Sequence, residues 1–324
     1  MNCIVKIGTL RKNLKQLEYP FALMVKANAY GHGLGFIKKT QDLVFAYGVA
    51  TEQEGIKLRS LTEKPILITA PDIKMSAMYE MYGLTPMIST PLQLLAINEN
   101  SKGCVKAHLK VDSGMGRFGC KTLKETKSMI VLADKLNRVK ISGICTHFSS
   151  LTTAETQMRI FDRHIDLAER FTGRLLRHAA ASGTRGVDKY DFRRIGYTAY
   201  ADVMKVTSEI ASVKTLKKGE RAGYNGVYQA TKKTDIAVVY GGYADGIPRN
   251  ALGYNVKIRG KNHKIVAVCM DIFIVELSCK CSVGDQVTIV GGKNSIEKLA
   301  EISGRIPYEI YVGFGGRCKF IYEE

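Results

Sequence analysis

Eight short apolar segments recur along the first two-thirds of the chain, and amphipathic stretches separate them. The segments are residues 22–26, 44–50, 65–69, 86–90, 107–112, 141–147, 175–180 and 190–195. Between them, apolar residues return every three or four positions, as in helices that bury one face, in Pro91–Asn98, Leu123–Leu136 and Ala154–Arg177. Eight strands alternating with helices over about 200 residues predict an α/β fold, a (β/α)8 barrel of the TIM type.

The pattern changes near residue 211. Short β-branched segments then follow one another, punctuated by glycine, asparagine and aspartate, at residues 235–240, 256–259, 264–268, 273–277 and 286–290. One helical stretch, Ser295–Ile302, interrupts them, with Asn294 and Ser295 as candidate N-caps. We therefore expect two domains: residues 1–211 as the barrel and residues 212–324 as a mostly antiparallel β-domain.

Composition and charge narrow the class of protein. Of the 324 residues, 45% are hydrophobic and 24% are charged, which is ordinary for a folded globular chain. The first residues carry frequent charges, and no run of about 18 uncharged apolar residues occurs, so we expect neither a signal peptide nor a membrane span. Lys and Arg exceed Asp and Glu by 18, but they are spread along the whole chain. This spread favours a solvated basic surface over a nucleic-acid site.

The eight cysteines follow no disulfide or zinc pattern, apart from the pair Cys279 and Cys281. Most stand beside apolar residues, as small core side chains do in a reducing cytoplasm. Two thiols two positions apart on a strand share a face, but no second pair completes a tetrahedral zinc site. We therefore expect a cytoplasmic protein without a bound metal.

Polar residues gather where the predicted barrel strands end, which is where barrels carry their functional groups. Lys26 ends the first segment, where an unpaired charge is costly. Its pKa should therefore be lowered, or its amine used as a Schiff-base nucleophile; the alternative is a lysine that snorkels to solvent. Other segments end in Lys110 with the glycine-rich loop of Arg117, in Thr146–His147 and in Arg194–Tyr197. Such cationic and imidazole groups suit an anionic ligand.

A phosphate site is expected in the loops after the seventh and eighth barrel strands, where such barrels usually bind phosphate. Ser182–Gly183 and Gly196–Tyr197 fall in these two loops.

Longer motifs make a family resemblance specific. VKANAYGHG, KVDSGMGRFG, THF, HAAAS, RIGY, GYNGVY, GYADGIPR and CMD follow one another in this order. The sequence resembles the alanine racemase family, pyridoxal-phosphate enzymes with a barrel and a C-terminal β-domain, from Ile4–Ile7 to Ile306–Glu309. It departs from the family at Asn225, where glycine is usual, at Ala181, where asparagine is frequent, and at residues 266–268, where Gly-Arg-Val is commoner.

The resemblance implies roles in binding pyridoxal 5'-phosphate. Lys26 would hold the cofactor as a Schiff base and act as one base. Arg194 would hydrogen-bond the pyridine nitrogen and leave it unprotonated, because a guanidinium keeps its proton. Arg117 would meet the phenolic oxygen and the substrate carboxylate, oriented by Lys110, which the family carbamylates. The phosphate contacts would come from Tyr30, Ser182, Gly196, Tyr197 and Tyr308.

Racemisation also needs a second base, because the Cα proton leaves from one face and returns to the other. In the family this base is a tyrosine of the partner subunit's β-domain, and Tyr224 matches it. His147, which also belongs to the cofactor site, and Arg194 would lower the pKa of this phenol, with His178 in support.

The resemblance further implies a homodimer. Tyr243 and Met270–Asp271 match residues that shape the substrate entrance and contact the substrate carboxylate from the other subunit. A monomer would lack its second base.

We interpret the chain as an alanine racemase, an isomerase that interconverts L-alanine and D-alanine. One alternative is a serine racemase of the same family; serine-preferring members tend to carry asparagine where this chain has the bulky Tyr308. The other is a pyridoxal-phosphate-binding barrel without catalysis, against which the β-domain with Tyr224 and Tyr243 argues.

Overall fold

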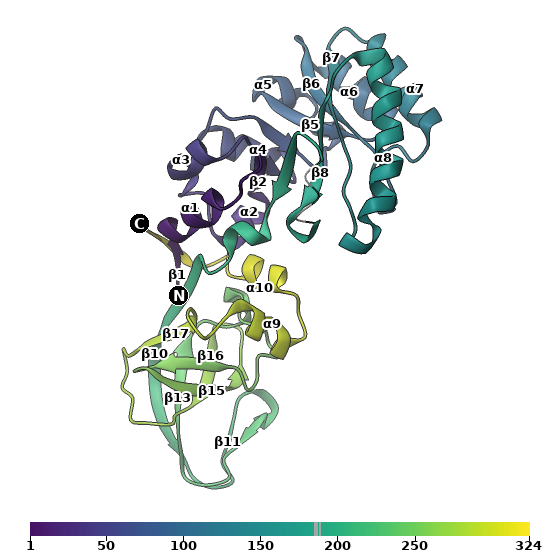
Figure 1. Ribbon diagram of the computed structural model, residues 1–324. Helices are drawn as coiled ribbons and strands as arrows, with labels where there is room; N and C mark the ends of the chain where they lie inside the picture. Colours follow the sequence, from purple (N-terminus) through teal and green to yellow (C-terminus); the bar gives the residue numbers. More distant parts are fainter. Residues whose placement is uncertain (185–186, 188) are drawn as a thin grey trace. The chain divides into compact units, whose positions relative to one another are not determined.

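The computed structural model describes residues 1–184, 187 and 189–324. Two compact units divide the chain (Figure 1). The barrel unit contains Asn13–Ala27 and Ile37–Ala199, and the β-rich unit contains Met1–Lys12, Asn28–Phe36 and Tyr200–Glu324. In the described part of the chain, none of the helices combines the length and the apolar character that a membrane crossing requires.

Eight parallel strands close the barrel, and each overlaps one of the eight apolar segments, so the predicted barrel is confirmed. Their bounds are β2 (Phe21–Met24), β3 (Ala46–Val49), β4 (Ile66–Ile68), β5 (Leu84–Ile88), β6 (Val105–Lys110), β7 (Val139–Cys145), β8 (Leu176–Ala181) and β9 (Phe192–Ile195). The ring closes where β2 pairs with β9. Six of the strands each contribute one buried residue to a core cluster: Ala22, Ala46, Leu67, Met87, Cys145 and Phe192.

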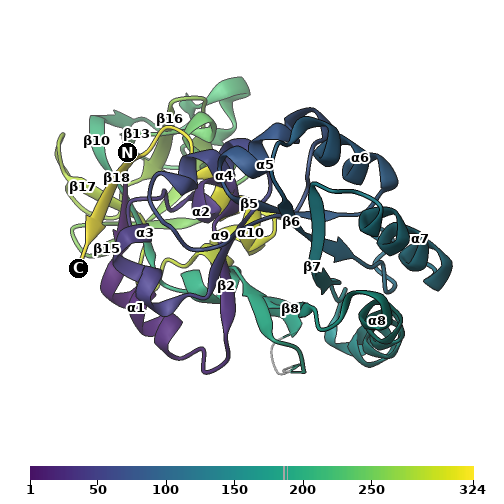
Figure 2. The same ribbon diagram turned by 90° about the horizontal axis from the view of Figure 1, so that it is seen from above.

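Helices lie outside the barrel strands, as the view in Figure 2 shows for α4 to α8. Their bounds are α3 (Ile37–Thr40), α4 (Glu52–Arg59), α5 (Ala77–Met81), α6 (Pro91–Asn100), α7 (Leu123–Asp134) and α8 (Leu151–Thr172). Short 3-10 turns accompany them: η1 (Gln41–Leu43), η2 (Ile73–Met75), η3 (Ser182–Thr184) and η4 (Tyr197–Tyr200). The last long helix was expected to reach Arg177 but ends at Thr172, because Gly173 adopts φ 73° and leaves the right-handed helical region.

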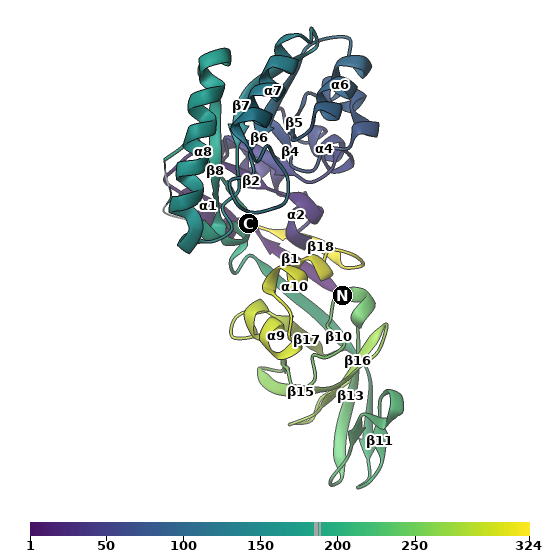
Figure 3. The same ribbon diagram turned by 90° about the vertical axis from the view of Figure 1, so that its right-hand side faces the viewer.

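An antiparallel β-barrel forms the core of the β-rich unit (Figure 3). Its strands are β10 (Met204–Leu216), β13 (Thr234–Tyr240), β14 (Asn255–Ile258), β15 (Lys261–Val268), β16 (Ile272–Glu276) and β17 (Gln286–Val290), with β11 (Arg221–Ala222) and β12 (Tyr228–Gln229) as a separate hairpin. β10 pairs first with β17 and then with β13, which closes the ring. The second, mostly antiparallel domain is thus confirmed.

Two helices complete this unit: α9 (Ile296–Ser303) and α10 (Pro307–Gly313). α9 overlaps the predicted helix, and its Ser295 hydroxyl accepts the N–H of Lys298 at 3.3 Å, as an N-cap does. The turns η5 (Tyr224–Gly226) and η6 (Tyr243–Asp245) lie in the same unit.

The two ends of the chain meet in the β-rich unit. β1 (Asn2–Lys6) pairs antiparallel with β10 and parallel with β18 (Lys319–Glu323), and α1 (Ile7–Lys15) follows β1. The expected domains, 1–211 and 212–324, divide the chain differently: residue 211 falls inside β10, and the first residues join the β-sheet. No glycine or proline interrupts residues 204–216, so the strand runs on, and the side chains of Cys3 and Val5 are buried in this unit.

Gly246 marks a position where the β-rich unit has no room for a side chain. Its φ is 99°, and a Cβ would lie 2.4 Å from the carbonyl carbon of Gly313. Gly253 has a similar φ of 85°, but nothing lies within 4 Å of its Cβ position. We expect Gly253→Ala to lower the free energy of unfolding by about 1 kcal/mol through backbone strain alone. Gly246→Ala should lower it by at least about 3 kcal/mol, because the clash is with backbone. Urea unfolding compares the two variants, and equal losses would contradict this packing.

Candidate active site

Lys26 stands two residues after β2, at the carboxyl end of the barrel strands. Its amine is half-buried, and its pKa is lowered, first by burial and then by the positive charge of Arg117, while Glu54 raises it. The direction is the one expected from the sequence. A larger share of this amine is therefore neutral near pH 7 than in an ordinary lysine, which is the form that a nucleophile or base needs.

Arg194, on β9, is buried among neutral hydrogen-bond acceptors. Its Nη2 donates to the carbonyl oxygens of Thr146, at 2.5 Å, and of Ala179, at 3.0 Å. The same atom lies 3.3 Å from Nδ1 of His147. Nη1 donates to Nδ1 of His178 at 2.7 Å. Burial lowers the pKa of Arg194, but a guanidinium keeps its proton at neutral pH. A fixed positive charge thus sits at the ends of three neighbouring strands.

Two histidines continue this network. His178 accepts from Arg194 at Nδ1, so its neutral ring carries the proton on Nε2, which lies 2.8 Å from Nδ1 of His108. Burial and the charge of Arg194 lower the pKa of both rings, that of His108 to about 4. The same two causes lower the pKa of His147 to about 3. All three imidazoles are therefore neutral at physiological pH.

Lys110 ends β6 and is almost fully buried, at 6% exposure. Its Nζ lies 3.5 Å from the carbonyl oxygen of Thr69 and 5.0 Å from the centre of the Phe118 ring. Burial lowers its pKa to about 8, and the neighbouring cations Arg194, Arg117 and Lys26 act in the same direction.

The loop after Lys110 presents Arg117 to solvent. Asp112 shapes this loop, because its Oδ1 accepts three consecutive backbone N–H groups, of Gly114, Met115 and Gly116, at 2.9–3.1 Å. These hydrogen bonds lower the pKa of Asp112, against an opposing effect of burial.

Ser182 marks a point where several hydrogen-bond donors converge. Its Oγ accepts the N–H of Gly196 at 3.1 Å and that of Thr198 at 3.4 Å, and it lies 3.2 Å from the Thr198 hydroxyl. Gly196 and Tyr197 connect β9 to η4, next to this point along the chain. The Ser182 hydroxyl accepts these donors here, and an anionic oxygen that took its place would receive the same N–H and hydroxyl groups. The barrel unit therefore offers donors for a phosphate together with a cluster of cations.

A left-handed turn follows Lys26. Ala27, Asn28, Ala29 and Tyr30 have φ between 51° and 54°, within the short helix α2 (Lys26–Gly31). For residues other than glycine this conformation costs about 1–2 kcal/mol each, so the turn needs support from its surroundings.

Glu54 supports the first residue of the turn. It is the third residue of α4, and its Oε2 accepts the N–H groups of Ala50 and Thr51, which completes a capping box. Its Oε1 accepts the N–H of Ala27 at 2.6 Å. One carboxylate therefore fixes both the start of a helix and the residue beside Lys26.

His32 supports the later residues, within the β-rich unit. Its Nδ1 lies 2.9 Å from the carbonyl oxygens of both Ala29 and Tyr30, and its ring stacks on Tyr200 with a centroid distance of 4.5 Å. Burial lowers the pKa of His32 to about 4, so this ring is neutral and donates from Nδ1. Tyr30 packs beside Tyr308, with ring centroids 6.0 Å apart.

The remaining predicted site residues lie on the surface of the β-rich unit. Tyr224 is 71% exposed and stands before Asn225, whose φ of 56° explains why glycine suits that position. Tyr243 is 43% exposed and Met270 50%. Asp271 accepts from Arg317, whose Nη1 lies 2.8 Å away.

The predicted site residues are thus divided between the two units. The barrel unit contains nine of them: Lys26, Lys110, Arg117, His147, His178, Ser182, Arg194, Gly196 and Tyr197. Tyr30, Tyr224, Tyr243, Met270, Asp271 and Tyr308 belong to the β-rich unit.

Sequence reasoning missed three residues that bear on these sites: Glu54, His108 and Arg317. The capping-box pattern of Thr51 with Glu54 was a readable signal for the helix start. Nothing in the sequence indicates that the same carboxylate reaches Ala27.

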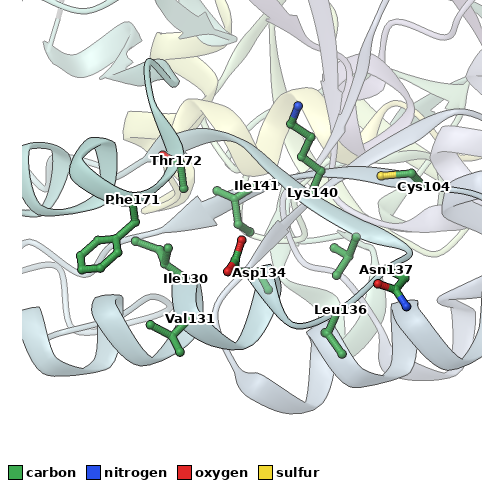
Figure 4. Close-up of a pocket in the computed structure, with 12 residues that line it drawn as sticks. Cys104, Ile130, Val131, Asp134, Leu136, Asn137, Lys140, Ile141, Phe171 and Thr172 are labelled. Atoms are coloured by element: carbon green, nitrogen blue, oxygen red, sulfur yellow. The ribbon is translucent and has the colours of Figure 1, made fainter.

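A cavity of about 410 Å³ lies elsewhere in the barrel unit (Figure 4). Residues of α7, β7 and the end of α8 line it, among them Ile130, Ile141 and Phe171. None of the predicted site residues lines this cavity, and the only charged side chains in its lining are Asp134 and Lys140. It is therefore separate from the cationic end of the barrel.

Two family models match nearly the whole chain: the alanine racemase N-terminal domain matches residues 5–203, and the C-terminal domain matches residues 203–322. The chain is 30% identical to an alanine racemase of Lactococcus lactis subsp. lactis (strain IL1403), covering 99% of this chain and 98% of that protein. It is 31% identical to alanine racemase 1 of Bacillus subtilis (strain 168), covering 98% and 90%. The crystal structure of alanine racemase from E. faecalis superposes with a TM-score of 0.92 at 28% identity, covering 99% and 98%.

Fold and site together define a protein of two barrels, one (β/α)8 and one antiparallel, with a lysine of lowered pKa and a buried arginine at the strand ends. The chain belongs to the alanine racemase family, a family of pyridoxal-phosphate-dependent racemases. The resemblance seen in the sequence is confirmed.

The variant Glu54→Gln distinguishes the two roles of this side chain, which are to cap α4 and to accept the N–H of Ala27. Gln93 holds the corresponding box of α6 through one amide oxygen, which accepts two backbone N–H groups, so glutamine can keep a box in this fold. The amide NH₂ would then face the N–H of Ala27, donor against donor. We expect the free energy of unfolding to fall by about 1–3 kcal/mol. The pKa of Lys26 should fall further, because the carboxylate raises it.

Urea unfolding measures the first effect, and competitive amine labelling across pH with peptide mass spectrometry measures the second. Glu125→Gln is the matched control, since Glu125 holds the capping box of α7 in the same way and its side chain supports no second segment in the contacts described. Equal behaviour of the two variants would show that Glu54 does no more than cap its helix.

Proposed function

We propose that this chain is an alanine racemase that binds pyridoxal 5'-phosphate and interconverts L-alanine and D-alanine. The observation that carries the proposal is Lys26: an amine of lowered pKa at the end of the first barrel strand, in the same unit as the fixed guanidinium of Arg194, in a chain of this family. Pyridoxal phosphate, when bound, withdraws electrons from the amino acid and makes its Cα proton removable.

The residues present fit this cofactor. Lys26 supplies the amine for the carbonyl group, and the donors that converge at Ser182 suit its phosphate. Arg194 would face the pyridine nitrogen and, because a guanidinium keeps its proton, leave that nitrogen unprotonated. Tyr30, Gly196, Tyr197 and Tyr308 are proposed as further phosphate contacts, with His147 beside the ring.

Lys26 would exchange the Cα proton on one face of the substrate. Its amine is neutral more often than that of an exposed lysine, so it can take a proton from Cα at neutral pH. His178 holds Arg194 in place and is itself held by His108, and both rings are neutral and do not compete for protons in this range. Arg117 would bind the substrate carboxylate.

Lys110 is proposed to be carbamylated. Only a neutral amine adds CO2, and burial lowers the pKa of Lys110 to about 8. The product carries a negative charge, which would turn a repulsive neighbour of Arg117 into an attractive one.

Tyr224 would serve the opposite face, contributed by a second copy of the chain. Its phenol is 71% exposed in a single chain, as expected for a side chain that acts on a partner. Tyr243, Met270 and Asp271 would reach the substrate entrance from the same partner surface. The proposed active unit is therefore a homodimer.

Proton NMR in deuterated water tests the activity. Purified protein with added pyridoxal phosphate receives L-alanine and L-serine separately, and the enantiomers are then analysed. We expect alanine to lose its Cα proton and to yield D-alanine, and Lys26→Ala to abolish both. Tyr224→Phe should slow racemisation by at least about 100-fold, because it removes one base.

Tyr240→Phe is the control, since Tyr240 is also exposed in the β-rich unit but has no proposed role. Exchange of the Cα proton without D-alanine would contradict the two-base mechanism. No exchange with either amino acid would leave a cofactor-binding relative or a different amino acid as the substrate, and serine reacting faster than alanine would favour a serine racemase.

Tyr308 is proposed to favour alanine over serine by its bulk. It is 39% exposed and packs against Tyr30. We expect Tyr308→Asn to raise kcat/KM for serine relative to alanine, and Tyr308→Phe to keep the preference, because phenylalanine preserves the ring. The ratio of the two kcat/KM values measures this, and an unchanged ratio in the asparagine variant would refute the role of bulk.

A further inference from the structure

We propose that His263, Cys279 and Cys281 form a zinc site in the β-rich unit, separate from the proposed reaction. The ligand atoms of these three residues lie within 4.8 Å of one another. The sequence showed only the two cysteines and therefore half a site; the third ligand comes from β15, sixteen residues earlier in the chain.

The spacing of these atoms fits tetrahedral zinc. The Sγ atoms of Cys279 and Cys281 are 4.0 Å apart, and Sγ of Cys279 is 4.0 Å from Nε2 of His263. With Zn–S bonds of about 2.3 Å, two sulfur ligands of a tetrahedral zinc lie about 3.8 Å apart. Small side-chain movements would therefore bring the three ligands to bonding distance.

The pairing of β15 with β16 brings these residues together. His263 is buried at 1% exposure, near the end of β16, and the segment that follows this strand contains Cys279. Asp285 holds that segment, since its Oδ2 accepts the N–H of Ser282 at 2.7 Å and lies 2.8 Å from Nε of Arg259. Hydrogen bonds thus hold the segment that carries the two cysteine ligands.

Ser278 orients the imidazole. Its backbone N–H donates to Nδ1 of His263 at 3.0 Å, and its hydroxyl lies 3.5 Å from the same atom. Zinc on Nε2 would require the ring proton to move to Nδ1, so the Ser278 N–H that donates to Nδ1 here would have to turn away and the Ser278 hydroxyl would move in to accept that proton. The hydrogen bond so formed, from the second ring nitrogen to an oxygen, is the one that a metal-bound histidine usually makes.

The fourth position would belong to solvent. Asp285 is already engaged by Arg259 and Ser282, whereas Cys279 is partly exposed and leaves a path for water. Two thiolates and one neutral imidazole around Zn²⁺ form a site without net charge, and binding would release the two thiol protons.

Cobalt spectroscopy tests the site on the full chain, reduced with a phosphine and freed of metal. We expect one equivalent of Co²⁺ to give thiolate charge-transfer bands and the visible absorption of a tetrahedral ion, and Zn²⁺ to displace it. Cys279→Ser and His263→Gln should abolish these bands. Cys104→Ser, which removes an exposed cysteine outside the cluster, should leave them unchanged.

Circular dichroism of each variant confirms that it is folded, and Cys279→Ser remains decisive if the buried His263→Gln fails to fold. X-ray absorption at the zinc edge should show two sulfur ligands and at least one nitrogen. Absence of the bands in the reduced chain, or bands that persist in folded Cys279→Ser, would overturn the proposal. So would a Cys279–Cys281 disulfide that survives the phosphine.

Discussion

The electrostatic environment at the strand ends of the barrel unit depends on Arg194, a guanidinium that is buried among neutral partners. An isolated buried charge is costly, and here carbonyl oxygens and an imidazole nitrogen satisfy its N–H groups without cancelling its charge. Burial is the largest cause of the lowered pKa of His108, His147, Lys110 and Lys26, and the remaining positive potential of Arg194 acts in the same direction on all four. Burial and this fixed charge together favour the neutral forms of the surrounding bases and leave a positive potential that suits an anionic ligand.

The backbone beside Lys26 requires a second kind of support. Four consecutive residues take the left-handed conformation, and strain of this size persists only where the surroundings impose it. Glu54 holds the first of them through its carboxylate and His32 the later ones through Nδ1 of its ring, in each case by hydrogen bonds to backbone atoms. Because Glu54 also caps α4, the backbone conformation beside Lys26 is tied to the start of a barrel helix.

The sequence predicted the repeated elements well and the long-range contacts poorly. Eight apolar segments alternating with amphipathic ones were sufficient for the barrel, because strand and helix periodicities are local properties. The division near residue 211 was less successful, since the pairing of β1 with β10 depends on residues about 200 positions apart. Lys26, Lys110 and Arg194 were predicted as site residues because each lies at or near the carboxyl end of a predicted strand. The tautomers of the histidines and the reach of Glu54 to Ala27 depend on distances that no local pattern encodes.

We propose that the environment of Lys26 makes this amine, among the chain's many lysines, the one that reacts with pyridoxal phosphate. Borohydride reduction after incubation with equimolar pyridoxal phosphate, followed by peptide mass spectrometry, measures where the cofactor becomes attached. We expect a single adduct on Lys26 in the folded chain. An adduct on Lys110, or adducts scattered over surface lysines, would contradict it.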